Sequence, residues 1–317
     1  MPLPINRREF MGTGLTGTGL AAGAALGLAP DIGFASPSNL EAGWIDSHVH
    51  VWTPDTERYP ISPNFKLADM APPSFTAEEL LQHCRPANVQ RIVLIQMSFY
   101  EFDHRYMLDV MKSQPGVFSG VALIDHQADD VERRIEALAQ AGMRGFRLHS
   151  RGDTKDWLRS ETMAALWRKA GKDGLAACLL INPDDLPQVD ALCKRFPETT
   201  VVVDHFARIG ISGELDPQPL NALCKLARFP NVHVKTSAFY ALGKKTPPYE
   251  DLLPMIRKVV DAFGPQRLMW GSDCPYQVQG EHNYEASIAL VRDRIDFLSE
   301  DEKQWMLRGT ANKVFFS

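Results

Sequence analysis

A short apolar run near the start of the chain decides the fold: residues 44–51, which read WIDSHVHV. The run contains three titratable residues, Asp46, His48 and His50, at alternate positions. Because successive side chains of a strand point to opposite faces, all three are predicted to lie on one side, facing the centre of a barrel. The pattern therefore predicts a buried strand whose carboxyl end carries titratable side chains.

Seven similar runs follow, and amphipathic helical stretches fill the intervals between them. Each run is short, continuously apolar or rich in β-branched residues, and bounded by polar residues, as is typical of buried parallel strands. The predicted strands are Trp44–Val51, Arg91–Met97, Val117–Ile124, Met143–Leu148, Ala176–Ile181, Thr200–Val203, Val232–Ser237 and Arg267–Gly271. One of the helices opens with a capping box from Thr76 to Glu79. Eight strands alternating with helices predict a single-domain (β/α)8 TIM barrel of the α/β class, over residues 44–317. An open doubly wound sheet is the alternative, but no glycine-rich phosphate loop follows any run.

Composition excludes several classes of protein. The 317 residues are 44% hydrophobic and 23% charged, with a formal net charge of −5, as in an ordinary globular protein. The charges form no acidic or basic block, so we expect no nucleic-acid or anionic-membrane partner. The five cysteines are odd in number and none has CxxC spacing, which argues against a disulfide framework or a structural zinc site.

The first 35 residues have the layout of an export signal. Residues 6–11 read NRREFM, which resembles the twin-arginine motif, and a stretch rich in glycine, alanine and leucine follows over residues 12–29. Residues 33–35 supply the small residues of a cleavage site. We predict a twin-arginine signal peptide over residues 1–35, a linker over residues 36–43, and a periplasmic protein exported by the twin-arginine translocase.

Polar residues collect just past the ends of the predicted strands. Parallel strands of a barrel end at the same mouth, so these side chains are predicted to converge there and form a catalytic site. They are Asp46, His48, His50, Gln96, Ser98, Tyr100, Asp125, His126, Arg147, His149, Arg151, Asn182, Asp204, His205, Arg208, Lys235, Ser237 and Asp273.

Several of these motifs together resemble one known family. The sequence IDSHVHVW at residues 45–52, GFRLH at 145–149, VVDHFAR at 202–208, MWGSDCP at 269–275 and GTANKVFF at 309–316 are similar to the amidohydrolase-related (amidohydrolase 2) family of the amidohydrolase superfamily. The resemblance covers nearly all of residues 44–317 and implies a (β/α)8 hydrolase.

The resemblance extends to the lactonase branch of that family, typified by 2-pyrone-4,6-dicarboxylate lactonase. In metal-dependent members, the first-strand histidines and last-strand aspartate hold a divalent ion with a fifth-strand histidine or a fourth-strand lysine or glutamate. This chain has Asn182 and Arg147 in those regions. No metal is therefore favoured; zinc or manganese would be held by His48, His50 and Asp273.

The resemblance implies a role for each part of the site. Asp273 is expected to activate the attacking water as general base. The histidines expected to polarise the lactone carbonyl are His48, His50 and His205. Arginines match carboxylates bidentately, and those expected to hold a substrate carboxylate are Arg147, Arg151 and Arg208. Further hydrogen bonds to the substrate are expected from Ser98 and Tyr100. The expected partner is a small acidic lactone, such as a sugar-acid lactone, a pyrone dicarboxylate or a muconolactone.

Three other functions use the same residues. A metal-dependent decarboxylase or hydratase would employ His48, His50 and Asp273 as ligands, and metal analysis separates it from a lactonase. A lactone isomerase would transfer the acyl group between hydroxyls, and product analysis identifies it. A non-catalytic sugar-acid binding protein fits export, but binding alone seldom needs a carboxylate beside three histidines.

Overall fold

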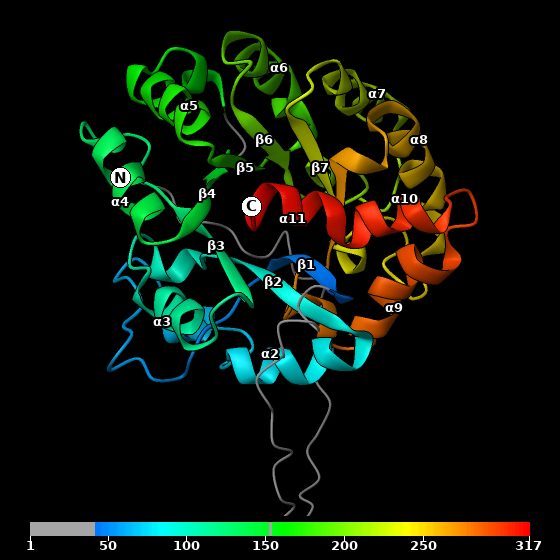
Figure 1. The fold of residues 1–317 in the computed structure, drawn as a ribbon, viewed down its shortest axis with the longest axis horizontal. Helices are drawn as coiled ribbons and strands as arrows, with labels where there is room; N and C mark the ends of the chain where they lie inside the picture. The colour runs from blue at the N-terminus through cyan, green and yellow to red at the C-terminus, as the bar shows by residue number, and fades with distance from the viewer. Residues whose placement is uncertain (1–41, 152–153) are drawn as a thin grey trace, which may run out of the picture.

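The computed structural model describes residues 42–151 and 154–317, and its centre is an eight-stranded sheet in which every neighbouring pair is parallel. The strands follow the order of the chain and curl into a nearly closed barrel surrounded by helices (Figure 1). They are β1 (Trp44–Val49), β2 (Val89–Ile95), β3 (Phe118–Leu123), β4 (Met143–His149), β5 (Ala176–Leu180), β6 (Thr200–Val203), β7 (Val232–Ser237) and β8 (Leu268–Gly271). The predicted barrel is confirmed for the described residues. The predicted signal peptide lies outside them, as does most of the linker.

Helices alternate with the strands and form the outer ring (Figure 1). The predicted capping box is present, because the Thr76 side chain accepts from the Glu79 backbone and Glu79 accepts from the Thr76 backbone. Two helices that the sequence analysis did not predict are α3 and α11. The helices are α2 (Ala77–Cys84), α3 (Arg105–Ser113), α4 (Val131–Gln140), α5 (Glu161–Asp173), α6 (Leu186–Arg195), α7 (Pro217–Lys225), α8 (Leu253–Phe263), α9 (Tyr284–Ala289), α10 (Glu300–Gln304) and α11 (Thr310–Phe315). In the described part of the chain, no helix combines the length and apolar character needed to cross a membrane.

The core has two layers, one between the strands and the helices and a smaller one inside the barrel. The inner layer joins Ile45, Val121, Val202 and Met269 to Phe315 of α11. Helix α11 lies across the middle of the ring in Figure 1, and the Ser119 hydroxyl near the start of β3 donates to the Phe315 carbonyl at 2.7 Å. Helix α11 thus closes the amino end of the barrel, and the carboxyl end remains for the functional site.

The seam between β1 and β8 is closed by backbone bonds from the site residues themselves. The Asp273 N–H donates to the His48 carbonyl at 2.8 Å, and the His50 N–H donates to the Cys274 carbonyl at 2.8 Å. Gly271 permits this close approach, because an added Cβ would lie 2.9 Å from Cβ of His48. Strands β1 and β8 therefore hold the histidines and the aspartate in a fixed relation.

The predicted orientation of Asp46 is wrong, because β1 contains an irregularity between Asp46 and Val49 that shifts its pairing with β2. Ile45 points into the barrel interior, whereas Val49 belongs to the outer layer, so the alternation changes phase between them. The Asp46 carboxylate instead accepts hydrogen bonds from the Ser272 backbone at 2.9 Å and the Tyr284 hydroxyl at 2.8 Å. Asp46 thus braces the seam and α9 rather than facing the barrel centre.

Candidate active site

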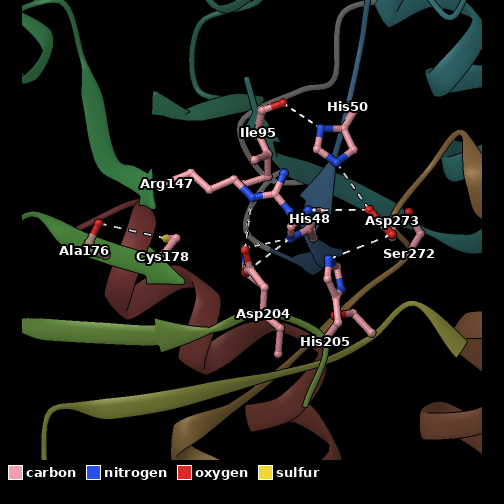
Figure 2. A network of polar contacts seen from close by, with 12 residues as sticks. His48, His50, Ile95, Arg147, Ala176, Cys178, Asp204, His205, Ser272 and Asp273 are labelled. Carbon is pink, nitrogen blue, oxygen red and sulfur yellow. Dashed lines mark hydrogen bonds and ion pairs between the residues drawn. The ribbon is translucent and has the colours of Figure 1, made fainter. Parts of the chain in front are cut away.

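The carboxylate of Asp273, at the end of β8, is the centre of a buried polar cluster (Figure 2). Its Oδ1 atom lies 3.3 Å from Nε2 of His50 and 3.5 Å from Nε2 of His48. Its Oδ2 atom accepts a hydrogen bond from the Tyr240 hydroxyl at 2.7 Å and lies 3.9 Å from Nε2 of His205. The structure therefore brings together the four residues predicted to be catalytic and adds Tyr240, which the sequence analysis missed.

Unusual backbone conformations position these side chains past the strand ends. Asp273 has φ 65°, and His205 begins a run of four residues with φ between 52° and 60° that ends at Arg208. Ala238, with φ 57°, precedes the short helical turn that carries Tyr240. A left-handed conformation costs a non-glycine residue about 1–2 kcal/mol, and such strain is found mainly where it serves function. The strain thus marks the barrel mouth as the functional face.

Each imidazole is held by a second contact on its Nδ1 atom. Nδ1 of His50 donates to the Ile95 carbonyl at 2.9 Å, because a carbonyl can only accept. Nδ1 of His48 lies 3.0 Å from Nζ of Lys235, and Nδ1 of His205 lies 2.8 Å from the Ser237 hydroxyl. All three rings therefore direct Nε2 towards Asp273.

A second buried carboxylate, Asp204 at the end of β6, lies beneath the cluster. Its Oδ1 atom is 3.1 Å from Nζ of Lys235 and 3.5 Å from Nδ1 of His48, and its Oδ2 atom is 3.5 Å from Nε of Arg147 (Figure 2). Burial alone would raise the pKa of Asp204, but the charges of Lys235, His48 and Arg147 outweigh it and hold that pKa well below its ordinary range. Asp204 is therefore an ionised partner of the groups around it.

Burial also determines the protonation of the cluster. It lowers the pKa of His205 to about 4 and that of His48 well below its usual value, where the charge of Lys235 adds to the effect. For Asp273, burial would raise the pKa, but the histidines, His205 foremost, outweigh it and hold the pKa below the ordinary range. At neutral pH the site therefore contains an ionised aspartate facing neutral imidazoles of His48 and His205.

The three predicted arginines gather around His149 at the end of β4. Burial, followed by the charges of Arg208, Arg147 and Arg151, lowers the pKa of His149 to about 3. Arg208 donates to Oδ1 of Asn182 at 3.0 Å, and the charge of Asp273 acts on Arg208 in turn. The cationic groups therefore lie on the β4–β6 side of the same mouth.

Two predicted substrate-binding residues have other contacts. The Tyr100 ring packs in the outer core, and its hydroxyl accepts from the Thr53 backbone at 3.4 Å. Ser98 begins the helical turn after β2 and is half-buried. Neither hydrogen-bonds to Asp273 within residues 42–151 and 154–317, so their contact with substrate stays a prediction.

The structure also assigns contacts to Tyr240, which the sequence analysis did not name, and to Lys235, which it placed at the barrel mouth without a specific role. Tyr240 lies three residues past β7, so extending the search for polar residues past strand ends would have found it. Lys235 points into the barrel and is completely buried. A lysine within a buried strand is the signal for such a residue, but its partner cannot be deduced from spacing.

One group of side chains could converge on a metal ion: His48, His205 and Asp273 each offer a ligand atom, all within 4.8 Å of one another. This set contains His205 in place of the predicted His50. A histidine ligand must offer a lone pair at Nε2, so the fit of His48 to a metal depends on which ring nitrogen carries its proton. That choice is governed at Nδ1 by its two polar neighbours, Lys235 at 3.0 Å and Asp204 at 3.5 Å.

The fold and the site together define a barrel hydrolase of the amidohydrolase class. Residues 45–316 match the family model described as amidohydrolase, and the chain therefore belongs to that family. This match confirms the resemblance seen in the sequence motifs.

The relatives that the chain resembles include hydrolases of cyclic esters. The L-fucono-1,5-lactonase of Burkholderia ambifaria is 30% identical over 276 residues, which cover 84% of this chain and 93% of that protein. The 2-pyrone-4,6-dicarboxylate hydrolase of Comamonas testosteroni is 29% identical over 262 residues, which cover 78% and 83%. A crystal structure of an amidohydrolase from Burkholderia multivorans with bound zinc shares 22% identity and a TM-score of 0.71, covering 86% of this chain and 98% of that one. This last likeness shows a common fold.

Proposed function

We propose that the protein hydrolyses the ester bond of a lactone ring, with Asp273 as the general base. The observation that carries the proposal is the buried Asp273 carboxylate, surrounded at the barrel mouth by His48, His50, His205 and Tyr240. The lactonase and the pyrone dicarboxylate hydrolase that the chain resembles both act on cyclic esters, which supports the same bond as target.

The attacking water is assigned to a position beside Asp273 and His50, within hydrogen-bond reach of both. Because Nδ1 of His50 donates to Ile95, a neutral His50 presents a lone pair at Nε2, 3.3 Å from Oδ1 of Asp273. Two acceptors facing each other can share the two protons of one water molecule. In this proposal His50 orients the water, a different role from the carbonyl polarisation expected from the sequence, and Asp273 takes the proton as the water attacks.

The remaining groups stabilise charge. With its ring proton on Nε2, His48 donates to the oxyanion that forms from the lactone carbonyl, assisted by His205. The Tyr240 hydroxyl occupies Oδ2 of Asp273, which leaves Oδ1 for the water. Asp273 then returns its proton to the leaving ring oxygen, so the ring opens to a hydroxy acid.

The charges of the site favour a lactone that bears a carboxylate. The charges that act on His149 are all cationic, from Arg208, Arg147 and Arg151, and the carboxylates that act on Arg208 are those of Asp273 and Asp204. Arginine pairs bidentately with carboxylates and is the preferred side chain for such recognition. We therefore place the substrate carboxylate on the β4–β6 side of the mouth.

A panel of lactones tests the proposal. L-fucono-1,5-lactone and 2-pyrone-4,6-dicarboxylate, the compounds named for the two relatives, are each followed by acid release with a pH indicator and by product analysis. Acid release with a ring-opened product supports hydrolysis. A ring-retained isomer with no acid release, or no turnover of any lactone in a broader panel, contradicts it.

A further inference from the structure

Lys235 is completely buried inside the barrel, between the site above it and the closing helix below. Its Nζ atom lies 3.0 Å from Nδ1 of His48 and 3.1 Å from Oδ1 of Asp204, and it also lies 5.5 Å from the centre of the Phe315 ring. The side chain therefore reaches the rear of the His48 imidazole from inside the barrel, on the opposite edge of the ring from Asp273.

The two polar neighbours of Nδ1 favour opposite tautomers of His48. A lysine ammonium has only protons to donate, so its bond requires a lone pair on Nδ1 and places the ring proton on Nε2. An ionised carboxylate only accepts, so Asp204, whose Oδ1 lies 3.5 Å from Nδ1, favours a proton on Nδ1. Lys235 is the closer of the two, and its ion pair with Asp204 keeps it next to the ring.

We propose that Lys235 is a positioning residue that fixes His48 in the Nε2–H tautomer and thereby makes this histidine a hydrogen-bond donor instead of a metal ligand. Nε2 of His48 makes no hydrogen bond within the described residues, and it lies 3.5 Å from Oδ1 of Asp273. Figure 2 shows His48 between Asp204 and Asp273. The proton is therefore available to a group bound over the site; that catalytic consequence rests on the proposed lactone hydrolysis, whereas the tautomer does not.

A purely structural role for Lys235 would be to neutralise Asp204. This alternative gives a different expectation, because neutralisation depends on charge and not on the bond to His48. Arg147 offers the matched control, because its Nε lies 3.5 Å from Oδ2 of the same carboxylate, whereas the ring of His48 is contacted at Nδ1 by Lys235 and Asp204.

The test is the tautomer of His48, measured through long-range proton–nitrogen couplings in protein labelled with ¹⁵N-histidine. The His48 signals are identified by their loss in His48→Gln. Wild-type protein is expected to show the Nε2–H tautomer. Lys235→Met leaves Asp204 as the polar neighbour of Nδ1, so the tautomer is expected to change to Nδ1–H, whereas Arg147→Met is expected to leave it unchanged.

Three outcomes of the tautomer measurement would contradict the proposal. An Nδ1–H tautomer in the wild type contradicts it directly and needs no variant, so the test stands even if Lys235→Met does not fold. An unchanged tautomer in folded Lys235→Met, or an equal change in Arg147→Met, also contradicts it. Because no substrate is present, a failure of the proposed lactone hydrolysis leaves this result intact, and the two outcomes are distinguishable.

Zinc binding supplies a second readout. Lys235→Met frees the Nε2 lone pair of His48 and removes one cation, whereas Arg147→Met removes one cation only. Lys235→Met is expected to bind Zn²⁺ at least about tenfold more tightly than Arg147→Met, which is the usual scale for a change in the partner behind a histidine ligand. Equal zinc affinities for the two variants, measured by competition with a zinc-binding dye, would contradict the tautomer assignment.

Discussion

Two buried aspartates, Asp46 and Asp273, have different roles because the groups around them differ. Asp46 and Asp273 are both shielded from solvent, and burial alone would raise the pKa of each. Asp46 is held by neutral donors, and its pKa is raised to about 6. Asp273 faces three imidazoles, which hold its pKa low. Asp46 is therefore suited to bracing the barrel, and Asp273 to accepting a proton from water.

Asp46→Asn is expected to stabilise the protein at neutral pH. An asparagine can accept from the Ser272 and His48 backbones through its oxygen and donate to the Tyr284 oxygen, so the contacts survive. Because folding raises the pKa of Asp46 to about 6, its contribution to stability is full below its ordinary value and is lost as the pH rises through about 6.

The stability difference between this variant and the wild type should therefore grow by about 2 kcal/mol between about pH 4 and about pH 8. Chemical denaturation at several pH values measures it. A difference that is the same at all pH values would show that Asp46 does not titrate in this range.

His48 and His205 should not titrate near neutral pH. Burial lowers the pKa of His205 to about 4 and that of His48 well below its usual value. Both rings are therefore neutral at pH 7, and His205 becomes charged only as the pH falls through about 4, where it would pair with Asp273 and weaken it as a base. We expect the ¹⁵N-histidine signals of both rings to remain those of the neutral form from about pH 8 to about pH 5. A titration midpoint between about pH 6 and 7 for either ring would contradict the assigned neutral state.

Arg147→Met should distinguish charged from neutral substrates. The loss of one charge-assisted contact is expected to raise KM roughly 10- to 100-fold for a lactone that bears a carboxylate. A neutral sugar lactone has no partner for that guanidinium, so its KM should change little. If KM changes equally for the two lactones, the role of Arg147 is its ion pair with Asp204 and not the binding of a substrate carboxylate.

Among the secondary-structure elements, β1 contains the feature on which the site depends, the irregularity that turns its two histidines towards the barrel mouth. It lets Ile45 fill the barrel interior while His48 and His50 also turn inward a few residues later. The pattern of hydrophobic residues predicts every strand to within two residues, because periodicity is a local property of the sequence. The irregularity depends on how β1 pairs with β2 and β8, so strict alternation gave the wrong side for Asp46. The left-handed run from His205 to Arg208 was equally out of reach, because it follows from tertiary packing and not from local preference.

Gly271→Ala tests the close contact between β8 and β1. The added Cβ would lie 2.9 Å from Cβ of His48 and 3.0 Å from its backbone nitrogen, so β1 must move away. A displacement of even about 1 Å in a catalytic group can lower the rate about 100-fold. We expect a loss of kcat/KM of that order with the far-ultraviolet circular dichroism retained. Full activity in a folded variant would mean that the seam does not set the position of His48.

At the scale of the whole molecule, the barrel separates stability from chemistry. Helix α11 closes the amino end with Phe315 in the inner core, and the left-handed residues Asp273 and 205–208 lie with the titratable groups at the carboxyl end. The sequence predicted that the functional groups lie at the carboxyl end of the barrel, because all eight strands were recognised and polar residues follow the end of each strand. The bonds from Tyr240 to Asp273 and from Lys235 to His48 were not predicted, since they depend on which residues meet across the barrel mouth.

Asp273 is proposed to activate water for lactone hydrolysis without help from a metal. The decisive quantity is the initial rate of lactone opening by chelator-treated, metal-analysed protein, comparing the wild type with Asp273→Asn, which keeps the shape of the side chain. We predict full wild-type activity after chelation and a loss of at least about 100-fold in kcat for the variant, whose fold is checked by circular dichroism. Wild-type activity that disappears with the chelator and returns with zinc, or substantial activity in Asp273→Asn, would contradict it.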